Sequence, residues 1–315
     1  MYNIPPQRPI IDQICFSIQG DFVSIEQSLI DVFGSGIRTS RGTHFKDANV
    51  FMSYPNKWGW FRINFPGTEG HLHCIGLALS KHVSTSSKKR TKGLKSLELS
   101  FDFPFPNVDY HEVEANLKKL AFRLFSLRGN RNHFHTYSGK EFKTCSDGAI
   151  NGLVTFYVHA INKEQQKKGK VVPAKNIATK TKVYCKKIDG IWNIRMEITL
   201  YSTALKYHFP FLPREYERIL KLCKSITLNE FLVFYTIDYD KFRTDANRIA
   251  EKNKKVNPKL NILLANSKNK PAIEQIRGMK KIADYICSSH LKNNVKRYCR
   301  VISFEEAMML PIDGV

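Results

Sequence analysis

One segment of the sequence, residues 97–103 (LELSFDF), alternates apolar and polar side chains without a break. Successive side chains of a β-strand point to opposite faces, so the leucines and phenylalanines would share one face. Glu98, Ser100 and Asp102 would share the other face. The segment therefore predicts a half-buried strand that presents two carboxylates on a rigid sheet.

The chain carries a large excess of positive charge. Its 315 residues include 50 Lys and Arg against 28 Asp and Glu, which gives a formal net charge of +22. This balance favours a nucleic-acid partner, because basic side chains that neutralise phosphates release condensed counterions. The alternative is a ribosome-associated or merely soluble basic protein.

The cysteines and the hydropathy pattern bear on the cellular compartment. The seven cysteines are scattered and form no C-x-x-C pair, which favours reduced thiols in an intracellular protein. The first residues lack the basic segment and apolar core of a signal peptide. No apolar run approaches the ~20 residues needed to span a bilayer. We expect a cytoplasmic protein without a membrane partner.

The order of patterns predicts an α+β fold in which helices flank an antiparallel sheet, with a smaller helical domain at the C-terminus. Strands are expected at 10–18, 48–54, 58–65, 71–79, 97–103, 150–160, 180–186 and 191–201. Helices are expected at 24–33, 110–127, 215–224, 228–233, 241–252, 272–287 and 303–309. Two prolines near residue 213 separate the two patterns, so we expect domains over 1–213 and 214–315.

Two histidine pairs, His71 with His73 and His133 with His135, each flank one hydrophobic residue. On a strand, the first pair would share a face with Cα atoms about 6.5–7 Å apart, so that both imidazoles could bind one divalent ion. The second pair lies in a polar stretch and is expected to be a solvated loop. Cys74 would point away from His73, which argues against a joint Cys/His zinc site.

Glu98 and Asp102 are the acidic candidates for the same ion. Their Cα atoms would lie about 13 Å apart along a strand, so at most one binds the ion directly. The other would orient a partner or act through water. An oxygen-rich ligand set with one imidazole suits Mg²⁺ or Mn²⁺ better than zinc. The alternative is a solvated strand face without an ion.

Tyr157, in the apolar run 154–159, is the candidate nucleophile of a nucleic-acid-cutting enzyme. Attack of its phenolate on a phosphodiester would give a covalent 5′-phosphotyrosine. Because the ordinary tyrosine pKa is about 10, a metal ion would have to polarise the phosphate. His159 would share its strand face, and Glu197 would brace the site from a second acid-bearing strand. Tyr184 is the rival nucleophile, and the alternative for Tyr157 is a packing role.

Two basic segments, 81–95 and 163–187, connect directly to the strands that carry these residues. The DNA-contacting residues expected in them are Lys88, Lys89, Arg90, Lys92, Lys163, Lys167, Lys168 and Lys170. The alternative is that these side chains only keep two loops solvated.

These segments, in this order, resemble the replication initiators of filamentous phages, of the gene II protein type, and the Rep proteins of rolling-circle plasmids. Residues 96–102 (SLELSFD) are similar to the family strand R-[IL]-D-x-x-F-[DS], with Glu98 in place of the first aspartate and Ser96 in place of arginine. Residues 155–164 are similar to the strand that carries the family's tyrosine, with His159 where lysine is usual.

The resemblance extends over roughly 10–213. Residues 194–200 (IRMEITL) match the family strand [VI]-R-x-E-x-x-[IL], and Lys206 and a Leu-Pro pair at 212–213 follow it as in the family. The opening, residues 9–12 (PIID), is similar to the family's usual start.

The resemblance implies a relative of the HUH-endonuclease sheet and a DNA-nicking enzyme that starts rolling-circle replication of a phage or plasmid in a bacterial host cell. Its substrate would be single-stranded DNA or an origin duplex, and a host helicase is a candidate partner. A transposase or relaxase with the same chemistry is one alternative. The other is a non-catalytic single-stranded DNA- or RNA-binding protein whose aromatic side chains stack on bases.

Overall fold

The computed structural model describes residues 9–80, 92–128, 133–135, 143–145, 153–157, 179–201, 204–205, 226–228, 231–268, 270 and 272–310. Its strands are β1 (Ile10–Gln19), β2 (Ile37–Arg38), β3 (Gly42–Phe45), β4 (Val50–Ser53), β5 (Trp60–Pro66), β6 (Lys92–Phe105), β7 (Leu124–Arg128), β8 (His133–His135), β9 (Lys143–Cys145), β10 (Leu153–Tyr157), β11 (Thr179–Ile188), β12 (Ile191–Tyr201), β13 (Leu232–Ile237) and β14 (Cys299–Ile302). Its helices are α1 (Phe22–Phe33), α2 (Glu69–Ser80), α3 (Tyr110–Arg123), α7 (Tyr239–Lys252), α8 (Pro258–Ser267), α9 (Ala272–Tyr285), α10 (Ser289–Asn293), the 3₁₀ helix η2 (Val295–Tyr298) and α11 (Phe304–Met309). None of the helices in these ranges is long and apolar enough to cross a bilayer.

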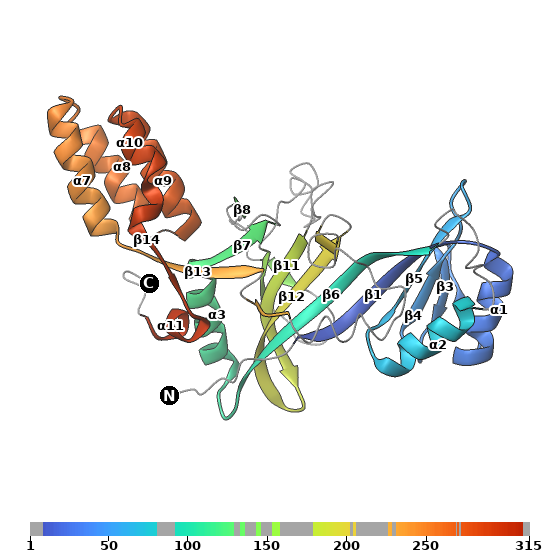
Figure 1. Ribbon diagram of the computed structural model, residues 1–315. Helices are drawn as coiled ribbons and strands as arrows, with labels where there is room; N and C mark the ends of the chain where they lie inside the picture. The colour runs from blue at the N-terminus through green and yellow to red at the C-terminus, as the bar shows by residue number, and fades with distance from the viewer. Residues whose placement is uncertain are drawn as a thin grey trace.

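A 10-stranded antiparallel sheet forms the body of the molecule, with the order β2-β3-β4-β5-β1-β6-β12-β11-β10-β9. The long strands β1 and β6 cross the molecule side by side (Figure 1). They join the N-terminal region, which holds β2 to β5 with α1 and α2, to the central region, which holds β11 and β12 with α3 (Figure 1). Strands that are far apart in the sequence therefore meet at the middle of one sheet.

The two faces of this sheet differ because the strands alternate apolar and polar side chains. Leu97, Leu99 and Phe101 of β6 are fully buried, and the apolar residues of β1, β5 and β12 belong to the same core cluster. Helices α1, α2 and α3 bury their apolar residues in this cluster. The opposite face of β6 and β12 carries charged and hydroxyl side chains, and it holds the candidate site.

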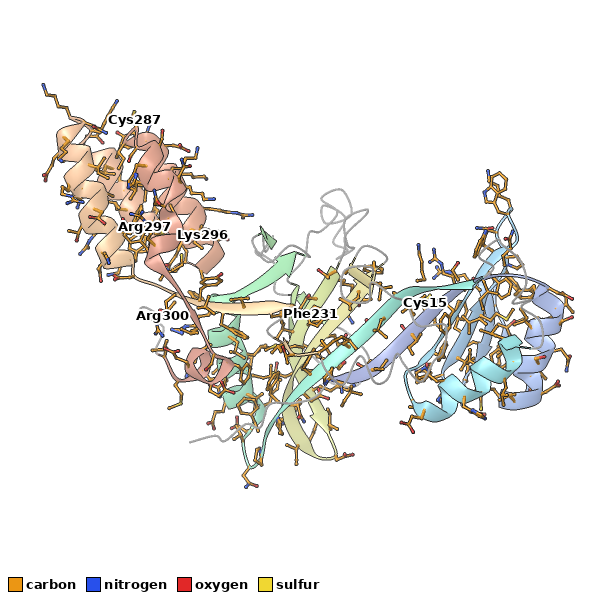
Figure 2. The ribbon with its side chains drawn as sticks, in the orientation of Figure 1. Cys15, Phe231, Cys287, Lys296, Arg297 and Arg300 are labelled. Carbon is orange, nitrogen blue, oxygen red and sulfur yellow. The ribbon has the colours of Figure 1, made fainter. Side chains whose placement is uncertain are left out.

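A second, four-stranded sheet has the order β14-β13-β7-β8 and combines strands from both halves of the chain. Phe304 of α11 stacks on Phe103 of β6 with ring centroids 4.0 Å apart. Helices α7 to α10 form a separate core, and β13 and β14 join this helical body to the rest of the molecule (Figure 1). Figure 2 shows Lys296, Arg297 and Arg300 at that junction.

The predicted fold class is confirmed: the protein is α+β, with helices flanking an antiparallel sheet and a helical C-terminal region. The strands expected at 10–18, 48–54, 58–65, 97–103, 180–186 and 191–201 are present, as are the helices at 24–33, 241–252, 272–287 and 303–309. The domain boundary near residue 213 stays a prediction. The described C-terminal residues also contribute β13, β14 and α11 to the second sheet and the main core.

The strand expected at 71–79 is wrong, because these residues belong to helix α2. Leu72, Ile75 and Leu79 are buried at the spacing of a helix, so the same apolar residues fit the helical period. Thr68 begins the helix: its Oγ1 accepts the backbone N–H of His71 at 3.3 Å. Such an N-terminal cap favours helix over strand.

Three further expectations are corrected around the second sheet. Helix α3 ends at Arg123 rather than 127, because residues 124–128 form β7 and pair with β13. Residues 133–135, expected as a loop, form β8 and pair with β7. The helix expected at 228–233 overlaps β13. The strand expected at 150–160 is the shorter β10, and the helix expected at 215–224 lies outside the described residues.

The buried face of β6 generates the first prediction. Phe101 is 0% exposed, so Phe101→Ala is expected to lower the free energy of unfolding by about 3–5 kcal/mol through lost burial and a residual cavity. Val23→Ala on α1, where Val23 is 70% exposed, is the control and is expected to change it by less than about 0.5 kcal/mol. Urea unfolding of both variants checks this. Equal effects would contradict the placement of Phe101 in the core.

Candidate metal centre on the polar face of the sheet

Four neighbouring strands, β1, β6, β12 and β11, supply one group of polar side chains. On β6, β12 and β11 these side chains alternate with the buried apolar residues, so they lie on the face away from the core. We call this group the polar face; it comprises Asp12, Glu98, Ser100, Asp102, Lys180, Lys182, Tyr184, Arg195, Glu197 and Thr199.

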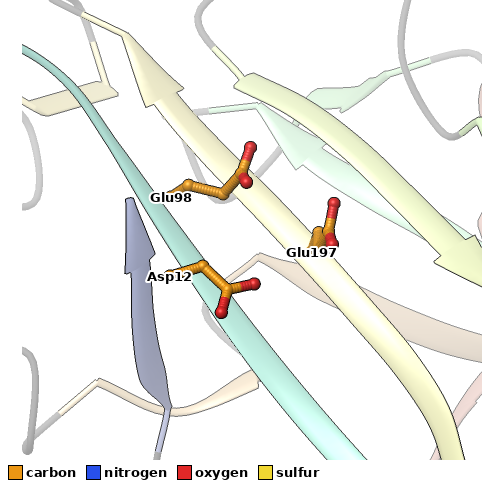
Figure 3. A group of neighbouring side chains, drawn as sticks. All are labelled: Asp12, Glu98 and Glu197. Carbon is orange, nitrogen blue, oxygen red and sulfur yellow. The ribbon is translucent and has the colours of Figure 1, made fainter. Parts of the chain in front are cut away.

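Three carboxylates of the polar face form an acidic trio: Asp12 from β1, Glu98 from β6 and Glu197 from β12. One oxygen of each lies within 4.8 Å of the others. Glu197 is buried, whereas Asp12 and Glu98 are half-buried. Figure 3 shows the three side chains extending over the same face from three adjacent strands. The trio is therefore fixed by strand pairing and not by a loop.

Arg195 positions one member of the trio. Its Nε and Nη2 donate to Oδ1 and Oδ2 of Asp102, each at 2.6 Å, and its Nη1 donates to Oδ2 of Asp12 at 3.0 Å. Ser100 also donates to that oxygen of Asp12. The side chains of Arg195 and Asp102 are 7% and 9% exposed, so their bidentate pair is shielded from water. Arg195 thus ties β12 to both β6 and β1.

The other two members have partners of their own. The hydroxyl of Thr199 donates to Oε2 of Glu98 at 2.7 Å. Lys182 donates to one oxygen of Glu197, and the hydroxyl of Tyr184 donates to the other. Each carboxylate of the trio therefore accepts a hydrogen bond that fixes its orientation, as partners of metal-ligating carboxylates do.

The surrounding charges shift several pKa values. Burial acts to raise the pKa of Glu197, but the charge and hydrogen bond of Lys182, the Tyr184 hydroxyl and the charge of Arg195 together lower it. Burial, followed by the negative charge of Glu197, raises the pKa of Tyr184 well above its ordinary value. Burial and then repulsion from Lys182 lower the pKa of Lys180. Glu197 is thus held ionised while Tyr184 keeps its proton.

The acidic trio could hold a divalent metal ion. Carboxylate oxygens are the ligands that Mg²⁺ and Mn²⁺ prefer. Opposite ligands of an octahedral Mg²⁺ lie about 4.2 Å apart, so small side-chain rotations would bring the three oxygens onto one ion. Arg195 pairs with Asp12 and Asp102, and Lys182 pairs with Glu197, whereas the hydrogen bond to Glu98 comes from the neutral hydroxyl of Thr199. The chemistry and the charge of the donor set therefore fit a divalent ion.

The structure brings together three of the acids that the sequence singled out. Glu98, Asp102 and Glu197 all lie on the polar face, and only the first and third belong to the acidic trio. Asp102 is occupied by the bidentate pair with Arg195. The expectation that at most one of Glu98 and Asp102 binds an ion directly stays a prediction.

The structure does not bring His71 and His73 onto a common face. Residues two apart on helix α2 are rotated by about 200° around the helix axis, so their side chains lie on nearly opposite sides of the helix. The ring of His71 is hydrogen-bonded to Thr68 and to the carbonyl of Ala48, at 2.7 and 2.8 Å, and it stacks on Phe33. His73 is exposed. The geometry that suggested a histidine metal pair is therefore absent from this helix.

The register of the sheet places Tyr157 in the same row of paired residues as Glu197. Tyr157 of β10 pairs with Lys182, which pairs with Glu197, which pairs with Ser100. This single row across four strands leads from the candidate nucleophile to the acidic trio. Tyr184 lies in the neighbouring row, opposite Arg195.

Several residues expected to act in the site fall outside the described ranges. They are His159, Lys88, Lys89, Arg90, Lys163, Lys167, Lys168 and Lys170. Lys92 is the first residue of β6.

Sequence reasoning missed Asp12, Lys182 and Arg195 as members of the site. The signal for the last two was the same alternation that identified Glu98, because each lies between apolar or hydroxyl residues of a strand. Asp12 breaks an apolar run, IIDQI, and a register shift between Ile11 and Gln13 marks its position in β1. An acidic residue within an apolar run was therefore the signal that could have identified Asp12 as a member of the site.

Comparisons with known proteins add little to this geometry. No family model and no curated protein match the chain. Among solved structures, a rolling circle replication initiator protein from Geobacillus stearothermophilus aligns with a TM-score of 0.34 and 14% sequence identity, over 73% of this chain and 87% of that chain. A likeness at this level carries no functional argument, so the proposal below depends on the site itself.

The bidentate pair generates the second prediction. Arg195→Gln is expected to lower the free energy of unfolding by about 3–5 kcal/mol, because it leaves Asp102 as a buried, uncompensated carboxylate. Adding Asp102→Asn is expected to restore part of the loss, because the unpaired charge is then removed. Denaturant unfolding of the single and double variants checks this. A double variant less stable than Arg195→Gln would contradict the assigned role.

Proposed function

We propose that the protein is a metal-dependent DNA-nicking and joining enzyme that initiates rolling-circle replication. The observation that carries this proposal is the row from Tyr157 to Glu197, which ends in three converging carboxylates within a chain of net charge +22. A carboxylate metal site beside a tyrosine provides the parts of a phosphodiester transesterification.

In this proposal Asp12, Glu98 and Glu197 hold Mg²⁺ or Mn²⁺, which would polarise the scissile phosphate when bound. Arg195, Thr199 and the other hydrogen-bond donors keep the carboxylates oriented. The phenolate of Tyr157, formed by loss of its proton to solvent, attacks the phosphorus and forms a new phosphorus–oxygen bond. The bond between phosphorus and the 3′-oxygen breaks, and the 3′-oxygen leaves and takes up a proton. The 5′-phosphotyrosine keeps the energy of the broken bond for the reverse attack by a 3′-hydroxyl.

Tyr184 has a different role in this proposal. Its hydroxyl donates to Glu197, so its proton is committed to positioning that carboxylate. Tyr157 is thus the assigned nucleophile, and Tyr184 is a positioning residue.

DNA would be bound over the face that holds the site. The basic segments 81–95 and 163–187 were expected as loops, but residues 92–95 belong to β6 and residues 179–187 belong to β11. The lysines and arginines that precede these strands in the two segments are proposed to contact phosphates on either side of the scissile bond. We also propose that the protein acts in the cytoplasm of a bacterial host cell and that a host helicase is its partner.

The third prediction tests the nucleophile. Tyr157→Phe is expected to abolish nicking of a supercoiled plasmid that carries the DNA flanking this chain's own coding sequence. DNA binding should persist, because the change removes one oxygen and little volume. The matched control is Tyr184→Phe, which is expected to lower the rate without abolishing the covalent adduct. Mass spectrometry of the wild-type adduct is expected to find the phosphate on the peptide that contains Tyr157.

Two results would contradict this assignment. An adduct on Tyr184, together with normal nicking by Tyr157→Phe, would exchange the roles of the two tyrosines. A wild-type protein that shifts the plasmid in a gel without nicking it or forming an adduct would show a non-catalytic DNA-binding protein instead.

A further inference from the structure

The loop that joins β4 to β5, residues 54–59 (YPNKWG), presents an unusually exposed aromatic side chain. Trp58 is 67% exposed and Tyr54 is 38% exposed, whereas Phe61 and Phe65 of the adjoining strand β5 are buried. The loop projects beyond the end of the sheet (Figure 1). An exposed tryptophan leaves an aromatic face available to a partner that can stack on it.

The backbone of this loop is held in place by its own hydrogen bonds. Asn56 Oδ1 accepts the N–H groups of Trp58 and Trp60 at 2.9 and 3.0 Å. The side chain of Gln19 donates to the carbonyl of Trp58 at 3.1 Å, and Gly59 adopts a φ of +72° that completes the turn. The loop therefore offers its tryptophan from a defined position on the sheet.

Two positively charged residues, Lys57 and Arg41, lie in or next to the loop. The amine of Lys57 lies 5.0 Å from the centroid of the Trp58 ring, which is a cation–π contact. Arg41 is exposed next to the loop, since its carbonyl accepts the N–H of Tyr54. Residues 48–66 contain no Asp or Glu. An aromatic face among positive charges suits a nucleobase whose phosphates lie nearby.

The loop and the acidic trio share strand β1. Trp60 pairs with Gln19 at one end of β1, and Glu98 pairs with Gln13 nearer the other. Six residue steps of strand separate the two positions, or about 20 Å. A single strand of DNA that occupies the site could follow β1 to the loop.

We propose that Trp58 is a stacking platform for an unpaired base of single-stranded DNA, with Lys57 and Arg41 contacting the adjoining phosphates. This inference deepens the proposed function, since it names single-stranded DNA as the form that the sheet binds beside the site. The ring face stacks on the base, and the stack needs no particular sequence because every base has a π-face.

The test measures binding of oligo-dT to the full chain in EDTA, so that cleavage plays no part. Trp58→Ala is expected to weaken binding about tenfold, as expected for the loss of one stacked base. Trp58→Phe is expected to keep most of the affinity because it retains an aromatic face. Unchanged thermal unfolding of both variants would show that the fold is intact, as expected for an exposed side chain.

Fluorescence provides a second readout, because the chain has three tryptophans, at 58, 60 and 192. Oligo-dT is expected to quench the fluorescence of the wild type and of Trp60→Phe, but to quench Trp58→Phe much less. Unchanged affinity of Trp58→Ala, or equal quenching in all three proteins, would overturn the inference.

The outcomes separate this inference from the proposed function. Binding that depends on Trp58 in a protein that forms no covalent adduct would leave the platform standing and remove the nicking activity. A protein that forms the adduct but binds oligo-dT equally well without Trp58 would support the nicking activity and rule out the stacking platform.

Discussion

The guanidinium of Arg195 joins three adjacent strands through two carboxylates. It belongs to β12, pairs with Asp102 of β6 through two hydrogen bonds, and reaches Asp12 of β1 with its remaining nitrogen. A planar group with donors in a fixed fork is suited to this task, and a lysine could not replace it. The position of Asp12, and hence the shape of the acidic trio, depends on this bridge.

The acidic trio brings like charges together, which is unfavourable unless other groups offset it. Lys182 pairs with Glu197, while the partner of Glu98 is the neutral hydroxyl of Thr199. The polar face carries four carboxylates (Asp12, Glu98, Asp102 and Glu197) against three basic side chains (Lys180, Lys182 and Arg195), on a protein that is strongly basic overall. A divalent cation bridged to a DNA phosphate would satisfy both the local negative charge and the overall positive charge.

Much of the fold followed from the sequence, because the strands that matter alternate clearly. Residues 97–103 and 191–201 showed which side chains face the core, so Glu98, Asp102 and Glu197 were found. Helix α2 was missed because its apolar residues fit more than one period, and the cap from Thr68 favours the helix.

The composition of the site was harder to predict, because alternation gives the face of a residue but not its neighbours. The order of strands places β1 beside β6 and β6 beside β12, although Asp12 and Arg195 are 183 residues apart in the sequence. Only this order shows that Asp102 pairs with Arg195 and that Asp12 takes its place in the acidic trio. The pairing of β10 with β11 likewise puts Tyr157 opposite Lys182.

The central claim is that Asp12, Glu98 and Glu197 form one divalent-metal site, and Mn²⁺ binding measured by electron paramagnetic resonance tests it most directly. The wild-type protein is expected to bind one Mn²⁺ with an affinity that Glu98→Gln weakens strongly. The control variant Glu112→Gln, at an exposed acid of α3, should bind as the wild type does. Equal Mn²⁺ binding by the wild type and Glu98→Gln would contradict the account.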